Sequence, residues 1–289
     1  MSDCELAVVV TTYNRALLLD EVLACLAKQT WLDGSWEIVV VDNNSTDETS
    51  EVLRGWEADM PVQFSAITAA DRQGPSYARN VGAASTQAVS VAFVDDDDLV
   101  GDGWVAAIGT SLREHSIVGS KFDHYALNAP EIAAGAEVQV DGLPKAYGAV
   151  AVSGGGLGCR RELWERLGGS NETLRYGEDI DLSIRATEAG EVPHFCAEAV
   201  YFPRLDVQSR MAFARGRQHG IASVDLYRRY GKAKGASPDR LGLLARVALG
   251  FVKRIPSLRD RSERNVYAEQ LGRRIGRLQA SATYRVWYP

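Results

Sequence analysis

Short apolar runs alternate with amphipathic stretches through the first part of the chain. The runs are rich in Val and Ile and predict buried strands at Leu6–Val10, Glu37–Val41, Val62–Ile67 and Val89–Val94. The stretches between them have helical spacing and predict helices at Leu17–Lys28, Asp47–Trp56 and Pro75–Ala84. Strands and helices that alternate in this way indicate an α/β fold, with a mainly parallel central sheet flanked by helices.

The pattern loosens beyond a further helix that we expect at Asp102–Arg113. Short strands and a Gly- and Pro-containing loop are expected from Ile117 to Val152. Two helices and a strand follow, predicted at Arg160–Leu167, Glu178–Ala189 and Val192–Phe202.

The last part of the chain changes character. We expect basic helices at Asp206–Tyr230, Leu241–Arg254 and Asp260–Gln279. The segment Gly231–Pro238 (GKAKGASP) is typical of a linker. We therefore predict one large domain over residues 1–230, with halves at 1–115 and 116–230, and a basic helical extension over 231–289.

The charge of the chain is unevenly distributed. Residues 1–200 hold 13 Lys and Arg against 32 Asp and Glu, and residues 201–289 hold 19 against 6, although the net charge is only −6. The basic extension either docks on the acidic part or meets a different partner. Nucleic acid is not the expected partner, because no recognised module accompanies the charge.

Cysteine usage and apolar runs bear on the cellular compartment. The four cysteines are widely separated and form no CxxC pair, which is typical of a reduced cytoplasmic protein. The N-terminus predicts a strand rather than a signal peptide. The run Leu241–Val252 is interrupted by Arg246 and is shorter than the roughly 18 apolar residues that a membrane span needs.

Four consecutive aspartates, Asp95–Asp98, follow the strand Val89–Val94 directly. Adjacent carboxylates repel one another, and a divalent cation such as Mg²⁺ or Mn²⁺ would neutralise them. The alternative is a solvated acidic loop, or an N-cap for the helix that follows. The sequence thus offers a candidate metal site at the end of a strand.

Other polar segments also follow strands directly. They are Thr11–Arg15, Asp42–Asp47 and Arg72–Ser76, and the last precedes a helix whose N-terminus could face a phosphate. Ligands of parallel α/β sheets bind beyond the carboxyl ends of the strands. Each segment alone could be a helix cap, but the three beside a candidate metal site suit a nucleotide diphosphate.

The second half supplies a run of glycines at Gly154–Gly156 and the acidic pair Glu178-Asp179. Glycines allow a ligand or another backbone to approach closely. The acidic pair opens a predicted helix, where carboxylates are favoured by the helix dipole. The functional alternative makes one of the two carboxylates a general base for a hydroxyl group.

Taken together, these segments resemble family 2 glycosyltransferases of the GT-A fold. The resemblance covers roughly residues 5–230 and rests on VVVTTYNR, EIVVVDNNSTD, RQGPSYARNVGA, VAFVDDDD, GCRRELWERLGG and GEDIDLSIRA, in that order. It implies a hexosyltransferase that moves a sugar, typically UDP-linked, from a nucleotide diphosphate to an acceptor hydroxyl with inversion. Residues 1–115 would then be the nucleotide-sugar half, and residues 116–230 the acceptor half.

The resemblance also implies roles for individual residues. The residues implied for the nucleotide sugar are Thr11, Tyr13, Asn14, Arg15, Asp42, Asn44, Gly74, Arg79, Asp95 and Asp96. Asp95 and Asp97 are the ends of a DxD motif that would hold Mn²⁺ or Mg²⁺. Asp179 would be the catalytic base, with Glu178 beside it. Gly155, Gly156 and Arg160 would lie on the acceptor side.

The sequence departs from the family pattern in places, which leaves some assignments open. Gly156–Cys159 and Gly168–Glu172 differ from motifs common on the acceptor side, so the acceptor remains unassigned. Phe202 stands where many members have a His, so the cation would rest on carboxylates, phosphates and water. Two alternatives also remain, a nucleotidyltransferase and a non-catalytic module that binds sugar nucleotides or glycans.

Two stripes of apolar residues in the basic extension allow two interpretations. The helices could pack on the body of the protein. They could instead attach the protein peripherally to the anionic inner face of a membrane, where a lipid-linked acceptor would reside. A glycan is the other acceptor class that we expect.

Overall fold

The computed structural model describes residues 4–133, 142–205, 208–231, 261–286 and 288. The chain divides into two compact units. The first comprises residues 1–127, 138–173 and 178–204, and the second comprises residues 128–137, 174–177 and 205–289. The second unit thus takes in the whole of the segment predicted as a helix at Asp206–Tyr230, whereas the predicted domain boundary stood at residue 230.

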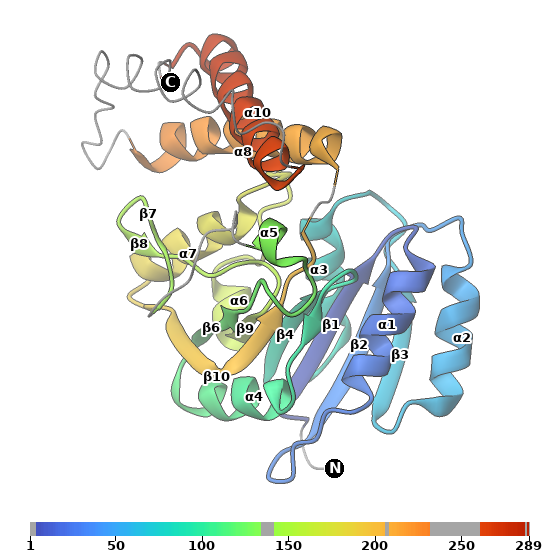
Figure 1. Cartoon of the computed structure of the whole chain (residues 1–289). Coiled ribbons are helices and arrows are strands. Elements are labelled where there is room, and N and C mark those ends of the chain that lie inside the picture. Colours follow the sequence, from blue (N-terminus) through green and yellow to red (C-terminus); the bar gives the residue numbers. More distant parts are fainter. Residues whose placement is uncertain (1–3, 134–141, 206–207, 232–260, 287, 289) are drawn as a thin grey trace. The chain divides into compact units, whose positions relative to one another are not determined.

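An eight-stranded sheet in the order β3-β2-β1-β4-β9-β6-β10-β5 forms the centre of the first unit (Figure 1). The strands are β1 (Leu6–Thr12), β2 (Trp36–Asp42), β3 (Gln63–Thr68), β4 (Ser90–Asp95), β5 (Leu99–Val100), β6 (Ile117–Phe122), β9 (Leu157–Arg160) and β10 (His194–Phe202). Strands β1 to β4 pair in parallel, as do β6 and β10, whereas β9 runs antiparallel to β4 and β6. The predicted α/β fold with a mainly parallel sheet is confirmed.

Six helices accompany this sheet in the described part of the first unit. They are α1 (Ala16–Leu26), α2 (Thr49–Asp59), α3 (Pro75–Ser85), α4 (Trp104–Glu114), α6 (Arg161–Arg166) and α7 (Glu178–Glu188). A two-stranded hairpin, β7 (Lys145–Ala146) and β8 (Ala149–Val150), lies in the segment that was expected to be loose. The predicted helices are all present, with ends shifted by up to three residues.

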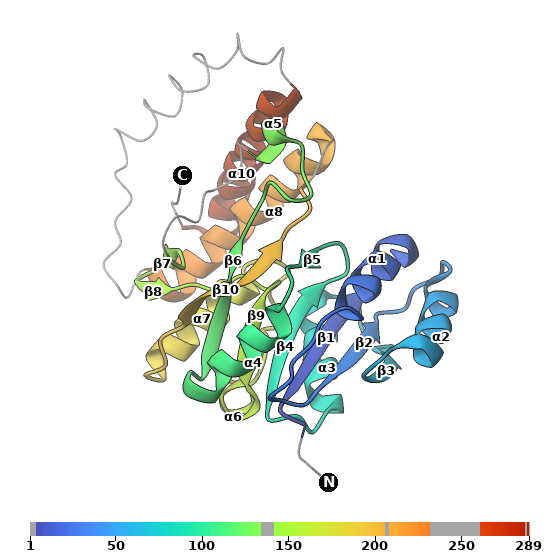
Figure 2. The ribbon, with the colours of Figure 1, turned by 60° about the horizontal axis from the view of Figure 1, so that its bottom comes forward.

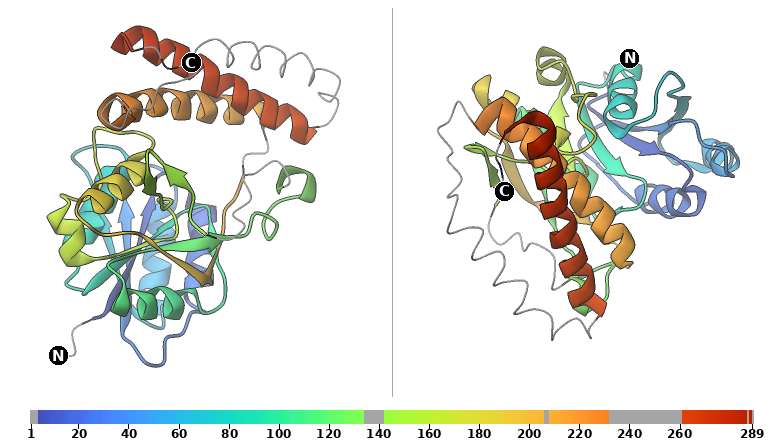
Figure 3. Two further views of the ribbon diagram at one scale, coloured as in Figure 1. Left: turned by 90° about the vertical axis from the view of Figure 1, so that its left-hand side faces the viewer. Right: turned by 90° about the horizontal axis from the view of Figure 1, so that it is seen from above.

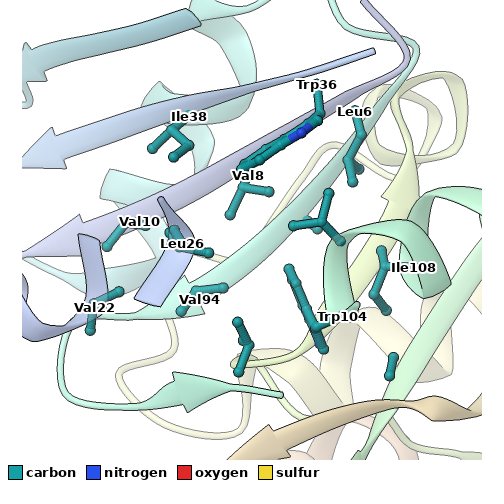
Figure 4. Packing of buried hydrophobic residues seen from close by; sticks show 14 of the residues in the cluster. Leu6, Val8, Val10, Val22, Leu26, Trp36, Ile38, Val94, Trp104 and Ile108 are labelled. Carbon is teal, nitrogen blue, oxygen red and sulfur yellow. The ribbon is translucent and has the colours of Figure 1, made fainter. Parts of the chain in front are cut away.

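The sheet has an apolar core on each face, because alternate side chains of a strand point to opposite sides. Leu6, Val8 and Val10 of β1 belong to one core, together with residues of α1 and α4 (Figure 4). Ala7 and Val9 belong to the other, which includes residues of α3 and α6. Figure 2 shows the same strands from a second direction. Burial on both faces explains why the strands read as continuous apolar runs.

Two glycines bring helices close to their neighbours in these cores. A side chain at Gly82 of α3 would overlap Val9, and one at Gly109 of α4 would overlap the ring of Trp31. These close approaches help to fix the helices against the sheet.

The second unit is helical in its described part. It contains α5 (Pro130–Ala133), α8 (Ser209–Leu226), a π-helical turn η1 (Tyr227–Gly231) and α10 (Arg261–Tyr284). Helices α8 and α10 lie side by side (Figure 3). A Cβ added at Gly216 would overlap the main chain of Glu269, and one at Gly220 that of Arg273. Because both contacts advance by four residues, the two helices run in the same direction.

The remaining predictions for the last part of the chain have different outcomes. The helices predicted at Asp206–Tyr230 and Asp260–Gln279 correspond to α8 with η1 and to α10. The helix predicted at Leu241–Arg254 and nearly all of the linker Gly231–Pro238 lie outside the described residues. Among the helices that the structure does describe, none has the length and apolar character to cross a membrane.

Candidate functional site

Polar side chains gather where β1, β2 and β4 end. Strand pairing places Thr11 of β1 beside Asp95 of β4, and Thr12 beside Asp42 of β2. The three polar segments that follow these strands therefore lie at one edge of the sheet. This is the edge at which parallel α/β sheets bind ligands.

The aspartate run forms a tight turn at this edge. The Asp98 main-chain N–H donates to the carbonyl of Asp95 at 3.3 Å. Asp96 and Asp98 are buried, whereas the side chains of Asp95 and Asp97 are 35% and 29% exposed. The two carboxylates that the sequence analysis assigned to the cation are therefore the more accessible pair.

Arg15 compensates part of the negative charge of this turn. Its Nη1 lies 2.9 Å from Asp96 Oδ1 and 2.5 Å from Asp97 Oδ2. The main-chain N–H of Tyr13 also donates to Asp96, at 3.3 Å. Burial nevertheless raises the pKa of Asp96 to about 6 and raises that of Asp97 as well, against the effect of Arg15. The turn is thus short of positive charge.

Arg79 of α3 joins the aspartate turn to the acidic pair of α7. Its side chain is only 7% exposed, and it lies 2.8 Å from Asp95 Oδ1 and 2.8 Å from Glu178 Oε1. Burial opposes its charge, but the two carboxylates outweigh burial and raise the pKa of Arg79. One buried cation therefore connects two groups that lie far apart in the sequence.

Asp179, the second residue of the acidic pair, is held by two main-chain N–H donors. Its Oδ1 accepts from the N–H of Ile180 at 2.7 Å, and its Oδ2 from the N–H of Gly154 at 3.2 Å. Burial and the neighbouring Glu178 raise the pKa of Asp179 to about 7, against these two bonds and Arg79. A carboxylate that titrates near neutral pH is suited to accept a proton in catalysis.

The glycine run packs directly against these charged groups. An added Cβ would lie 2.9 Å from Arg79 Nη2 at Gly154, and 2.9 Å from Asp95 Oδ2 at Gly155. Gly156 has a φ of +75°, which disfavours a side chain there. Only glycines allow the loop to approach so closely, and the structure thus brings Gly155 and Gly156 to the site.

The nucleotide candidates around β2 also hold the local backbone in place. Asp42 accepts from the N–H of Ser45 at 2.9 Å, and Asn14 accepts from the N–H of Thr46 at 2.7 Å. Asn44 donates to the carbonyl of Ala70 at 3.0 Å. Asn14 and Asn44 have φ values of 53° and 67°, which Asn tolerates better than most residues. These contacts shape the edge on which a nucleotide would lie.

Asn43 has a structural role that the sequence analysis missed. It is buried and donates to the carbonyls of Ala69 and Arg72 at 2.8 and 2.7 Å. It also accepts from the N–H of Gly74 at 2.7 Å, just before α3 begins. Asn43 therefore fixes the loop that precedes Arg79. Its sequence neighbours have the same chemistry, so nothing in the pattern distinguished it.

Arg160 lies apart from the other candidates. It pairs with Ser90 at the beginning of β4, whereas Asp95 ends that strand. Its guanidinium donates to the carbonyls of Leu112 and Arg113 at the end of α4. Strand β9 runs antiparallel to β4, so the chain leaves the site at Gly156 and reaches the opposite edge at Arg160. We therefore withdraw Arg160 from the acceptor side.

Two further residues touch the aspartate turn without having been singled out. The main-chain N–H of Arg204 donates to Asp98 at 2.7 Å, and its Nε donates to the carbonyl of Asp97 at 2.9 Å. Tyr201 accepts from the N–H of Asp95 at 3.1 Å. Tyr201 reaches the turn because β10 pairs with β5 and β6, and Arg204 follows the end of β10 by two residues. No spacing of residues in the sequence predicts these pairings.

The donor set fits a cation that takes only some of its ligands from the protein. No cluster of three or more His, Cys, Asp or Glu suited to a metal occurs among the described residues. Asp95 and Asp97 offer carboxylate oxygens, and each shares one oxygen with an arginine. Mg²⁺ and Mn²⁺ are commonly held by one or two carboxylates together with phosphate and water.

Comparisons with known proteins agree with this geometry. The chain is 39% identical over 103 residues to validoxylamine A glucosyltransferase of Streptomyces hygroscopicus subsp. jinggangensis, covering 36% of this chain and 24% of that protein. It is 31% identical over 109 residues to the poly(ribitol-phosphate) beta-N-acetylglucosaminyltransferase TarS of Staphylococcus aureus, covering 38% and 19%. The matches thus span a quarter or less of these relatives.

A solved structure extends the likeness to almost the whole chain. A mannosyltransferase from Pyrobaculum calidifontis, solved with GDP-Man and Mn²⁺, has a TM-score of 0.63 at 19% identity, covering 96% of this chain and 88% of that one. This similarity concerns the fold, which is of the GT-A type. Residues 7–135 match the profile of the family described as Glycosyl transferase family 2. These residues are a little under half of the chain, and through them the chain is similar to the glycosyltransferases of that family.

Proposed function

We propose that the protein transfers a sugar from a nucleotide diphosphate to an acceptor hydroxyl by direct displacement, with inversion at the anomeric carbon. The observation that carries this proposal is the bridge formed by Arg79 between Asp95 and Glu178. It connects the aspartate turn, which would hold the cation of a nucleotide diphosphate, to the acidic pair Glu178-Asp179, which would take the proton of an acceptor hydroxyl. A nucleotidyltransferase would have no need for the second group.

The donor would bind along the ends of β1, β2 and β4. Thr11, Tyr13, Asn14, Asp42 and Asn44 surround the place for the nucleotide, and Gly74 opens α3 beside it. Arg15 and Arg79 would bring positive charge to the donor side. Asp95 and Asp97 would hold Mn²⁺ or Mg²⁺, and a bound cation would neutralise the charge that develops on the departing diphosphate.

The acceptor would bind on the side of Asp179. This carboxylate would take the proton of the attacking hydroxyl, because its pKa of about 7 leaves it both basic and substantially ionised near neutral pH. Glu178, fixed by Arg79, would orient the acceptor. Gly155 and Gly156 would admit it close to the backbone. Attack on the face opposite the leaving group gives inversion.

The acceptor class that we propose is a glycan or a lipid-linked sugar. Its lipid-linked form would place the protein at the cytoplasmic face of a membrane. The Arg-rich helices α8 and α10 of the second unit would then contact anionic lipid headgroups. Sedimentation with anionic vesicles would test this contact, which should weaken as salt is raised and fall when residues 239–289, which include α10, are removed.

A donor screen tests the central proposal. UDP-, GDP- and dTDP-sugars are added with Mn²⁺, and thermal unfolding is followed. A ligand at 100 times its Kd stabilises the folded state by about 2.7 kcal/mol, which raises Tm by roughly 5–10 °C in a protein of this size. We expect UDP-sugars to raise Tm more than GDP- or dTDP-sugars do. The proposal fails if no nucleotide sugar shifts Tm and none is consumed in the presence of glycan acceptors.

A further inference from the structure

A single buried hydroxyl group ties together the two ends of the aspartate turn. Tyr201 of β10 is 1% exposed. Its Oη accepts from the main-chain N–H of Asp95 at 3.1 Å and hydrogen-bonds to the carboxylate of Asp98. The first and last aspartates of the run are therefore linked through one side chain from a distant strand.

Strand pairing on both sides holds Tyr201 in this place. It pairs with Val100 of β5 and with Phe122 of β6. The Phe122 and Tyr201 rings lie 5.3 Å apart, and the carbonyl of Tyr201 accepts from the N–H of Asp123 at 2.9 Å. The position of the hydroxyl is thus set by the sheet.

The same tyrosine meets the glycine run. A Cβ at Gly155 would overlap Tyr201 Oη, and a Cβ at Gly156 would lie 3.1 Å from Tyr201 Cδ2. The preceding residue, Gly154, donates its N–H to Asp179. Tyr201 therefore contacts both the aspartate turn and the loop that supports the proposed base.

Only a hydroxyl can serve both aspartates. The Asp95 N–H needs an acceptor, and the Asp98 carboxylate needs a donor. The main-chain N–H of Arg204 also donates to Asp98, at 2.7 Å, so the carboxylate of Asp98 is bonded to two residues. A phenylalanine would keep the ring and lose both bonds.

We propose that Tyr201 is a positioning residue for sugar transfer. By fixing the backbone between Asp95 and Asp98, it aims the Asp95 and Asp97 carboxylates at one divalent cation, and it packs against the glycine run beside them. This inference rests on the proposed function. In this role Tyr201 acts through the aspartate turn and not by contact with the substrate or the cation.

The variant Tyr201→Phe tests this role in the full chain. We expect the Mn²⁺ concentration that half-saturates UDP binding to rise about tenfold, the effect of one lost hydrogen bond at a ligand site. UDP affinity without Mn²⁺ should change less than twofold, which a general loss of structure would not allow. Hydrogen exchange at the Asp95 amide should accelerate at least tenfold. Calorimetry and NMR give the two measurements.

Tyr77→Phe is the matched control, because its hydroxyl bonds Asp71 at 3.4 Å on an exposed part of α3. It should leave Mn²⁺ dependence and Asp95 exchange unchanged. If Tyr201→Phe does not fold, Phe122→Leu loosens the ring that lies 5.3 Å from the Tyr201 ring and should shift Mn²⁺ dependence in the same direction.

The outcomes separate the two proposals. Unchanged Mn²⁺ dependence and unchanged Asp95 exchange in Tyr201→Phe would overturn the role of Tyr201 while leaving the proposed function intact. A wild-type protein that binds none of UDP, GDP or dTDP with Mn²⁺ would overturn the proposed function together with the role that rests on it.

Discussion

The substitution Asp179→Asn should stop sugar transfer and make the protein more resistant to alkaline conditions. The amide cannot accept the proton of the acceptor hydroxyl, so catalysis should fall by at least 100-fold. Nucleotide binding should persist, because Asp179 contacts the glycine run and not the aspartate turn. One substitution would then remove the activity and also increase stability at high pH.

The stability effect follows from the pKa of this carboxyl. Its ordinary value is 3.8, and burial together with Glu178 raises it to about 7 in the folded protein. Between these values the folded state holds a proton that the unfolded state has lost, so the free energy of unfolding falls as pH rises. Each pH unit corresponds to about 1.4 kcal/mol while the proton stays bound, which gives about 2 kcal/mol between pH 5 and pH 7 because half of the folded molecules have lost the proton at pH 7. Asn cannot ionise and escapes this loss.

Urea unfolding of the wild type and of Asp179→Asn at several pH values measures the effect. The difference in unfolding free energy should move in favour of the variant by up to about 3 kcal/mol between pH 5 and pH 8. Asp47→Asn is the control, since hydrogen bonding, chiefly from Thr49, lowers the pKa of Asp47. Asp47 is ionised in both states over this range, so its difference should be flat. A flat difference for Asp179→Asn as well would refute the raised pKa, and full transferase activity would refute its role as the base.

Other predictions concern the cation, the charge bridge and the helix pair. Asp97→Ala should weaken UDP binding about tenfold with Mn²⁺ and little without it, and equal calorimetric affinities in both conditions would contradict the metal role. Arg79→Met should cost about 3 kcal/mol of stability at pH 8, because Asp95 and Glu178 lose the guanidinium group between them. The loss should be smaller at pH 5, and urea unfolding at the two pH values measures it. Gly220→Leu should separate α8 from α10 and speed proteolysis of α10, whereas Leu at the exposed Ala214 should not.

Much of the fold could be predicted from the sequence because buried parallel strands leave a strong signal. Both faces of β1 and β4 are covered, so they read as apolar runs that end abruptly in polar segments. Those endings also predicted the candidate site, since the carboxyl ends of parallel strands meet at one edge. At that edge the structure also brings Arg79 of α3 to Asp95, which the strand endings did not predict.

Arg160 shows the limit of this reasoning. The segment from Gly154 to Arg160 is continuous in sequence, and it was assigned to one side of the site as a unit. Strand β9 runs antiparallel to β4, so each residue moves the chain away from the site by about 3.3 Å. Over the four residues from Gly156 to Arg160, the chain therefore moves about 13 Å away from the site. The direction of a strand depends on its pairing with other strands and cannot be inferred from the residue pattern.

Tyr201, Arg204 and Asn43 were missed for a related reason. Their contacts with Asp95, Asp98 and Gly74 depend on which strands and loops become neighbours. The sequence by itself determined the alternation of elements, the carboxylates at the strand ends and the resemblance to a family, because these follow from local pattern and composition. The tertiary structure decided which carboxylates are buried, which share a cation and which titrate near neutral pH. Desolvation and charge pairing depend on distances between residues that the order of the chain does not contain.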